Sequence, residues 1–136
     1  ILGPVKYYTD GSGAEFLQKK NGKLIMNGRQ IFNFAARDVF SQIESILKFQ
    51  NLIVDDIDLF CLHQGSKAII DYIKRKLQIN DNKIIYDIEN SGNTVSSSIP
   101  LAFKKKFYDT NSNRVILSGF GVGLSSATAL ITRRKT

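Results

Sequence analysis

Short apolar runs alternate along this chain with segments of helical periodicity, and this alternation restricts the possible fold more than any other feature. In residues 29–49 the apolar side chains recur every three or four positions, which is typical of an amphipathic helix. Two more helices are expected, one over residues 66–79 with Ser66 as its N-cap and one within residues 90–107, beginning near Pro100. Strands are expected at 5–10, 23–27, 59–62, 83–88, 114–120 and 124–132.

The order of these elements predicts an α/β domain. Strands that alternate with helices favour a mostly parallel sheet covered by helices on both faces, and the last two strands, joined by a few residues, should be antiparallel. The 136 residues are enough for one domain over residues 1–136, and they contain no linker or internal repeat. The chain begins with Ile1, so we expect either a removed start residue or a piece of a longer protein.

Net charge and cysteine content narrow the classes of partner and site. The net charge of +7 favours an anionic partner such as nucleic acid, a membrane surface, a phosphorylated ligand or an acidic protein, although a lysine-rich surface without a partner fits equally well. Basic and aromatic residues do not interleave as a nucleic-acid platform requires, and no apolar run approaches the roughly 20 residues that cross a bilayer. One cysteine and one histidine exclude an internal disulfide and leave too few ligands for structural zinc, so we expect no metal and a reducing, cytoplasmic location.

Polar or glycine-rich loops follow three of the expected strands. His63 and Gln64 follow the strand that ends at Leu62, "NSGN" at 90–93 follows the next strand, and "GFGVG" at 119–123 follows "VILS". The carboxyl ends of strands in an open α/β sheet form the edge where ligands bind, so three loops there indicate a site. Each loop also has a purely structural interpretation, as a satisfied histidine, an ordinary turn or a hairpin. "GFGVG" opens no helix, so it is not a dinucleotide-binding motif.

Cys61 is a second candidate for chemistry, because it lies two residues before His63 on the same face of the strand. A reactive cysteine usually needs a helix N-terminus or a neighbouring cation to lower its pKa. Cys61 lies inside an apolar run and has neither, and burial would raise the pKa of its thiol. We therefore expect Cys61 to be a structural residue.

Three longer segments carry a resemblance to a known family. The segments "LHQGSKAIIDYIKRKL", "YDIENSGNTVSSSIPLAF" and "ILSGFGVGLSSATAL" occur in this order. Together with "TDGSG" and "MNGRQIFNFA", they resemble the C-terminal half of β-ketoacyl-acyl-carrier-protein synthase III, of the thiolase-like superfamily. The resemblance extends from about residue 5 to residue 132. It implies a five-stranded mixed sheet with helices, and an enzyme whose N-terminal, nucleophile-bearing half is absent from this chain.

The resemblance implies a decarboxylative Claisen condensation between an acyl thioester and malonyl-acyl-carrier protein, as in fatty acid biosynthesis. By match to the family motifs, His63 and Asn93 would stabilise the enolate formed from the malonyl thioester. The backbone N–H of Val122, between Gly121 and Gly123, would hold the oxyanion at the acyl carbon. The implied carrier-protein-binding residues are Gln64, Gly65, Ser66, Lys67, Ala68, Arg75 and Lys76.

Val122 is a mild departure from the family pattern, because a backbone donor tolerates a valine, and three further positions also depart from it. Ser66 replaces the usual asparagine, Ala68 the usual arginine, and Ser126 a frequent tryptophan. These changes affect the expected carrier and acyl preference more than the reaction type.

The partners that the resemblance implies are the N-terminal half, an acyl carrier protein, a coenzyme A thioester and a second copy in a full-length homodimer. The substrates would be an acyl-coenzyme A and malonyl-acyl-carrier protein, with no further cofactor, nucleic acid or membrane involved. Without the nucleophilic half, this chain alone should be inactive. Two alternatives stay open: a specialised acyltransferase or condensing relative in a secondary pathway, and a non-catalytic carrier-protein-binding domain.

Overall fold

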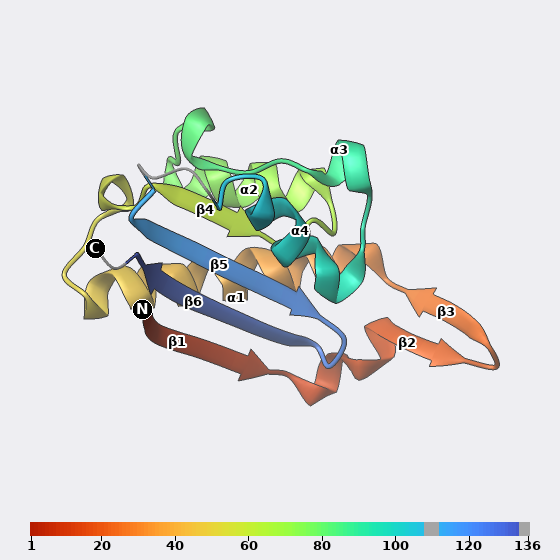
Figure 1. Ribbon diagram of the computed structural model, residues 1–136. Helices are drawn as coiled ribbons and strands as arrows, with labels where there is room; N and C mark the ends of the chain where they lie inside the picture. The colour runs from red at the N-terminus through yellow and green to blue at the C-terminus, as the bar shows by residue number, and fades with distance from the viewer. Residues whose placement is uncertain (108–111, 134–136) are drawn as a thin grey trace.

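The computed structural model describes residues 1–107 and 112–133 of the chain (Figure 1). The main elements follow one another along the chain in this order: β1 (Leu2–Thr9), β2 (Leu17–Lys20), β3 (Lys23–Met26), α1 (Gly28–Phe49), β4 (Leu59–Leu62), α2 (Lys67–Leu77), α3 (Ile88–Ser91), α4 (Ser98–Lys104), β5 (Arg114–Gly121) and β6 (Ser125–Thr132). Short 3₁₀ helices lie at Gly11–Phe16, Val54–Asp56, Asp81–Lys83 and Val95–Ser97. None of the described helices is long and apolar enough to cross a membrane.

The main sheet has four strands in the order β1-β6-β5-β4 (Figure 1). β4 and β5 are parallel and are joined by a crossover that contains α2, α3 and α4, whereas β5, β6 and β1 pair in antiparallel fashion. β2 and β3 form a separate antiparallel hairpin that projects from the body of the domain (Figure 1). The antiparallel pairing of the last two strands is confirmed, but the expectation of a mostly parallel sheet is wrong.

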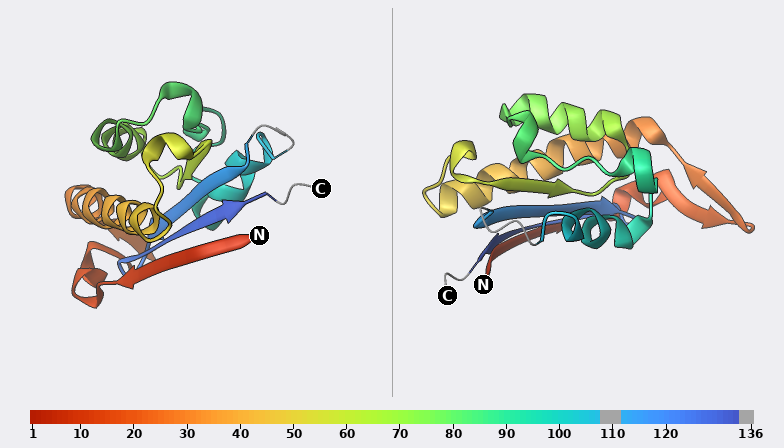
Figure 2. Two further views of the ribbon diagram at one scale, coloured as in Figure 1. Left: turned by 90° about the vertical axis from the view of Figure 1, so that its left-hand side faces the viewer. Right: turned by 45° about the horizontal axis from the view of Figure 1, so that its top comes forward.

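One face of the sheet carries the main hydrophobic core. α1 and α2 lie side by side on this face (Figure 2) and pack against Phe60, Leu62 and Ile116 of β4 and β5. Asn27 begins α1 as its N-cap, because its side-chain oxygen accepts the backbone N–H of Gln30 at 3.2 Å. The stripe of apolar residues at spacings of three and four is the buried face of α1, as the sequence predicts.

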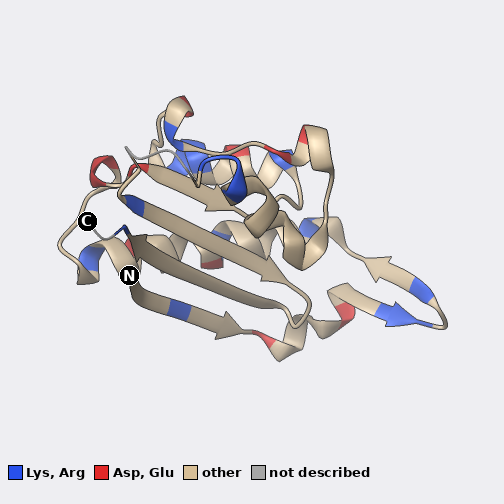
Figure 3. Ribbon diagram, viewed as in Figure 1, with Lys and Arg blue, Asp and Glu red and all other residues tan. Residues whose placement is uncertain are grey.

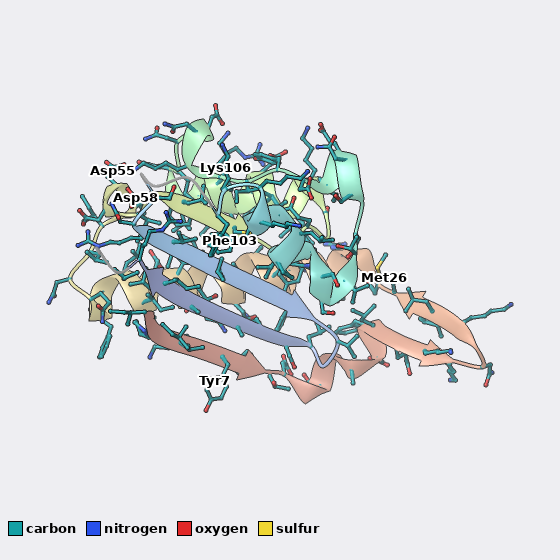
Figure 4. The ribbon with its side chains drawn as sticks, viewed as in Figure 1. Tyr7, Met26, Asp55, Asp58, Phe103 and Lys106 are labelled. Carbon is teal, nitrogen blue, oxygen red and sulfur yellow. The ribbon has the colours of Figure 1, made fainter. Side chains whose placement is uncertain are left out.

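The opposite face of the sheet is covered only in part. Alternate residues of β4, Leu59 and Cys61, point to this side and pack with Ala102 of α4. Phe103 of α4 lies over the same region, whereas Tyr7 of β1 extends away from the sheet with 83% of its surface exposed (Figure 4). An open apolar groove therefore runs over β1, β6 and the end of β5. The expected cover of helices on both faces holds for one face and for the β4–β5 part of the other.

The segment 83–88 does not form the expected fifth strand. Ile84 makes an isolated parallel bridge with Phe60, and the Ile85 N–H donates to the Phe60 carbonyl at 3.0 Å. Beyond that point the backbone N–H groups of Asp87 and Ile88 donate to the Gln64 side chain. Because a side chain takes these donors, the segment leaves the sheet after one bridge. The α/β class is confirmed, with four strands in the main sheet instead of five.

Candidate active site

The loops that follow β4, α3 and β5 meet at one edge of the sheet, as the sequence predicts. The His63 N–H donates to the carbonyl of Ser118 in β5 at 2.8 Å, so His63 continues the β4–β5 pairing. Its ring lies 5.0 Å from the Phe120 ring, centroid to centroid, in an edge-to-face arrangement of 81°. The end of β4 is thereby held against the end of β5, directly before the glycine turn.

Gly65 shows how close His63 and Asn93 are. A Cβ atom built on Gly65 would lie 2.8 Å from Nε2 of His63 and 3.8 Å from Nδ2 of Asn93. Both nitrogen atoms therefore border the same small volume, and their separation cannot exceed these two lengths together. A side chain at position 65 would collide with the imidazole, so glycine leaves this volume free for another group.

His63 is half-buried, and its two ring nitrogens have different surroundings. Nδ1 lies 2.6 Å from the hydroxyl oxygen of Ser98, at the start of α4. Nε2 has no hydrogen-bond partner among the described residues and faces the volume beside Gly65. Burial lowers the pKa of His63 below its ordinary value of 6.5, so the ring is neutral at pH 7. A neutral imidazole offers one N–H to a ligand without carrying a charge.

Asn93 is exposed, and its side chain is fixed by one atom. Its Oδ1 accepts the backbone N–H of Val95 at 2.9 Å, which orients the amide group. Within the described residues, the amide nitrogen Nδ2 donates to no acceptor. The open sides of His63 and Asn93 therefore offer two nitrogen atoms to whatever occupies the volume between them.

Gln64 has a different environment from its neighbour His63. Only 1% of its surface is exposed, and its Nε2 donates to the carbonyls of Leu62 at 2.7 Å and Ile85 at 3.2 Å. Its Oε1 accepts the N–H groups of Asp87 at 2.7 Å and Ile88 at 3.1 Å. The side chain therefore joins β4 to the segment before α3 and does not reach a surface. This burial contradicts the expectation that Gln64 contacts a carrier protein.

Asp87 and Lys105 form an ion pair that the sequence did not reveal. The Asp87 carboxylate is 1% exposed, and it accepts hydrogen bonds from Lys105 and from the hydroxyl of Ser91. These two hydrogen bonds lower the pKa of Asp87 below its ordinary value of 3.8, and the hydrogen bond from Lys105 has the larger effect. The pair ties the end of α4 to the start of α3, on either side of the loop that carries Asn93.

The glycine turn after β5 lies where the sequence predicts it. Gly121 ends β5, and Val122 is 70% exposed. Gly123 has a φ of +144°, and a Cβ there would lie 2.7 Å from the backbone nitrogen of Ser125, so glycine is required. The turn is two residues from Phe120, which packs against His63. Its proposed role as an oxyanion site remains a prediction.

The residues expected to bind a carrier lie on and before α2. Ser66 is at the N-cap of α2, although its side chain makes no capping hydrogen bond, and Lys67 pairs with Glu89 at 2.5 Å. Arg75 and Lys76 are exposed in the last turn of α2, where the Lys76 ammonium lies 3.9 Å from the centre of the Phe40 ring. Figure 3 shows basic residues grouped along this helix. Together with Gly65 and Ala68, these residues remain predicted contacts.

Neither Cys61 nor the acidic residues that the structure describes form a further catalytic or metal centre. Cys61 is fully buried, with its Sγ 3.6 Å from the carbonyl oxygen of Ile99, and burial raises the pKa of the thiol to about 12. Such a thiol is protonated at pH 7, as expected for a structural residue. Over residues 1–107 and 112–133, no group of three His, Cys, Asp or Glu side chains could hold a metal ion.

The chain is similar in sequence to a known family of proteins. Residues 47–133 match the family model described as 3-oxoacyl-[acyl-carrier-protein (ACP)] synthase III C terminal. The chain is 36% identical over 117 residues to β-ketoacyl-[acyl-carrier-protein] synthase III of Lactococcus lactis subsp. cremoris, which covers 82% of this chain and 36% of that protein. It therefore spans about a third of the length of this curated relative.

Solved structures show the same similarity. The structure of β-ketoacyl-[acyl carrier protein] synthase III from Thermus thermophilus matches with a TM-score of 0.91 and 29% identity, over 99% of this chain and 47% of the other. The priming β-ketosynthase from the R1128 polyketide biosynthetic pathway matches with a TM-score of 0.86 and 28% identity, over 98% of this chain and 46% of the other.

Proposed function

This chain belongs to the family of 3-oxoacyl-[acyl-carrier-protein] synthase III C-terminal domains, and we propose that it is the C-terminal catalytic half of a condensing enzyme. The similarity to the Thermus thermophilus structure confirms the expected thiolase-like α/β half. The proposed reaction joins an acyl thioester to malonyl-acyl-carrier protein by decarboxylative Claisen condensation, as in fatty acid biosynthesis. The nucleophilic cysteine would come from an N-terminal half, because Cys61 is buried and protonated.

The observation that carries this proposal is the pair of nitrogen atoms beside Gly65. Decarboxylation of a malonyl thioester breaks the bond to the carboxylate carbon, releases CO₂ and moves the electron pair onto the thioester oxygen as an enolate. N–H groups at Nε2 of His63 and Nδ2 of Asn93 would donate to that oxygen. The donors are fixed before the reaction, by Ser98 and by the Val95 N–H, so little reorganisation is needed when the charge forms.

The second step would use the glycine turn. The enolate carbon attacks the acyl group carried by the cysteine of the other half, and an oxyanion forms at the acyl carbon. The backbone N–H of Val122 would donate to this oxyanion, together with an N–H from the missing half. Collapse of the oxyanion expels the cysteine thiolate and leaves the β-ketoacyl product. Gly121 and Gly123 on either side allow the acyl group to approach the backbone closely.

The open side of the sheet supports the need for a second half. Val5 and Tyr7 of β1 are exposed, and the apolar groove over β1 and β6 leads to Phe120 beside His63. The N-terminal half would pack against this groove and would also exclude water from the donors. Homodimer formation would belong to the full-length enzyme.

The basic residues of α2 would receive the acidic carrier protein. Lys67, Arg75 and Lys76 are exposed, and complementary charge accelerates encounter with an acidic partner. An acyl-coenzyme A would be the other substrate, and the proposal involves no further cofactor. It places the enzyme in the cytoplasm, where acyl carrier protein and coenzyme A thioesters would be available.

A hybrid enzyme tests the proposal. Residues 1–136 would replace the matching C-terminal segment of the Lactococcus lactis relative, and CO₂ release from malonyl-acyl-carrier protein would be measured. We expect decarboxylation by the hybrid, no turnover by the isolated chain, and a loss of about 100-fold or more for His63→Ala or Asn93→Ala. Gln50→Ala, an exposed residue beyond α1, serves as the matched control. Unchanged decarboxylation in both His63→Ala and Asn93→Ala would contradict the assignment.

A condensing relative of a secondary pathway is a second candidate. Ser66 and Ala68 depart from the family pattern in the carrier-facing segment, and the R1128 priming β-ketosynthase is similar over nearly the whole chain. Such an enzyme would use the same donors with another acyl group or another carrier protein. Competition in the hybrid between a fatty-acid carrier and a polyketide carrier would separate the two candidates.

A further inference from the structure

Ser98 is the only described residue that forms a hydrogen bond with the His63 ring. It is the first residue of α4, is 2% exposed, and lies 35 positions from His63 in the chain. Its hydroxyl oxygen is 2.6 Å from Nδ1 of His63 and 3.3 Å from the backbone nitrogen of Gln64. Because this hydroxyl is buried, its own proton also needs an acceptor.

The hydrogen bonds at the Ser98 hydroxyl determine which ring nitrogen of His63 carries the proton. A hydroxyl has one proton to donate and two lone pairs to accept with. The Gln64 N–H donates to one lone pair, because an amide nitrogen cannot accept. If Nδ1 of His63 also carried a proton, it would donate to the second lone pair, and the Ser98 proton would need another acceptor. Among the described residues the Ser98 hydroxyl has no such acceptor, and a buried donor without a partner is destabilising.

The opposite arrangement satisfies every group. With Nδ1 unprotonated, the Ser98 hydroxyl donates to it while accepting from the Gln64 N–H. The single proton of the neutral ring then lies on Nε2, the nitrogen that borders the volume beside Gly65 and Asn93. We propose that Ser98 is a positioning residue, which holds His63 in the tautomer that carries its proton on Nε2.

The catalytic consequence of this inference rests on the proposed function, whereas the tautomer itself does not. In the proposed reaction only an N–H at Nε2 can donate to the enolate oxygen. A ring with its proton on Nδ1 would present a lone pair to that oxygen and repel it. Ser98 would therefore decide whether the geometry of His63 and Asn93 is productive.

The tautomer can be measured directly because His63 is the only histidine in the chain. In a ¹⁵N-labelled sample at pH 7, long-range proton–nitrogen correlation spectra distinguish a protonated from an unprotonated ring nitrogen. We expect Nε2 protonated and Nδ1 unprotonated in the wild-type chain. In Ser98→Ala the two nitrogen shifts should move toward each other, as the proton is shared between two tautomers. Ser97→Ala, an exposed neighbour, should leave both shifts unchanged.

Two results would overturn the inference. The first is a wild-type spectrum with the proton on Nδ1, which needs no variant and so does not depend on whether Ser98→Ala folds. The second is a folded Ser98→Ala whose ring shifts equal those of the wild type. Ser98→Thr, which keeps the hydroxyl, should restore the wild-type shifts if it folds with the same circular dichroism.

Kinetics in the hybrid enzyme give a second readout. Ser98→Ala should lower kcat for decarboxylation by about 10-fold with little change in KM, a smaller loss than the roughly 100-fold expected when the donor itself is removed. Ser98→Thr should recover most of the rate. If the unmodified hybrid failed to decarboxylate, the proposed function would be in question, while the spectra of the isolated chain would still decide the role of Ser98.

Discussion

The loop cluster at the end of β4 has two sides that differ in how their hydrogen-bonding groups are used. On the inner side, formed by Gln64 and Asp87, the Gln64 amide has all four of its hydrogen-bonding positions filled by protein. On the outer side, formed by His63 and Asn93, one nitrogen of each residue has no partner among the described residues. Polar residues that are neighbours can therefore have different roles. A residue whose polar atoms all have protein partners stabilises the fold, whereas a residue with an unpartnered polar atom can bind a ligand.

The substitution Gln64→Met should have the largest effect on stability, because it breaks the inner side. It removes the N–H donor that serves the Leu62 and Ile85 carbonyls. It also removes the oxygen that accepts two backbone N–H groups, at a site that is 1% exposed. A buried polar group without its partner costs about 1–3 kcal/mol, so we expect a loss of about 3–5 kcal/mol in the free energy of unfolding after partial relaxation. Urea unfolding of the isolated chain, followed by circular dichroism, measures this change.

The matched control for this change is Gln50→Met, because Gln50 is exposed. Its effect should stay within about 0.5 kcal/mol. If Gln64→Met cost no more than the control, the inner side would not hold the loops together, and the contrast between the two sides would fail.

The substitution Lys105→Met should have an intermediate effect, and it tests the inner side through charge. It leaves the Asp87 carboxylate, which is 1% exposed, without its cation. Since Lys105 is itself half-exposed, water can partly replace it, and we expect a loss of about 1–3 kcal/mol at pH 7. Lys106→Met, at the exposed neighbouring position, should change stability by less than about 0.5 kcal/mol.

The pH dependence of this loss follows from the lowered pKa of Asp87. A carboxyl group with a lower pKa in the folded state stabilises the fold above its unfolded pKa of 3.8, and this contribution is lost as the pH falls through the folded pKa. The difference between wild type and Lys105→Met should therefore be largest near neutral pH and shrink below pH 4. Urea midpoints measured from pH 7 down to pH 3 check this, and a difference that grew with acid would contradict it.

The sequence predicted those parts of the fold that depend on local periodicity. The stripe of apolar residues identified α1, and the short apolar run 59–62 identified β4, because burial of one face imposes a regular spacing. β2 was missed because "LQKK" contains one apolar residue and is defined only by its pairing with β3. The apolar segment 83–88 was wrongly predicted as a strand, because the competitor for its N–H groups is a side chain about 20 residues earlier.

In the site, too, the sequence revealed residues in local motifs but not residues whose partners are distant in the chain. His63 and Asn93 were found because they stand in motifs at strand ends, and the structure brings them to one volume. Ser98 and Lys105 were missed, since their partners lie 35 and 18 positions away and nothing local marks a serine or lysine as buried or paired. Gln64 was assigned to a carrier surface because its motif suggested it, and only the fold shows that it is buried.

The substitution Asn93→Asp should have the smallest effect on stability, and it separates the role of the Asn93 oxygen from that of its nitrogen. An aspartate keeps the oxygen that accepts the Val95 N–H at 2.9 Å, so the free energy of unfolding should change by less than about 0.5 kcal/mol. It removes the N–H donor and puts a negative charge where the enolate oxygen would form, so decarboxylation by the hybrid enzyme should fall by about 100-fold or more. Urea unfolding of the chain and CO₂ release from the hybrid measure the two quantities separately. A hybrid that kept its rate with Asn93→Asp would show that the outer side holds Asn93 for its oxygen alone, as the inner side holds Gln64.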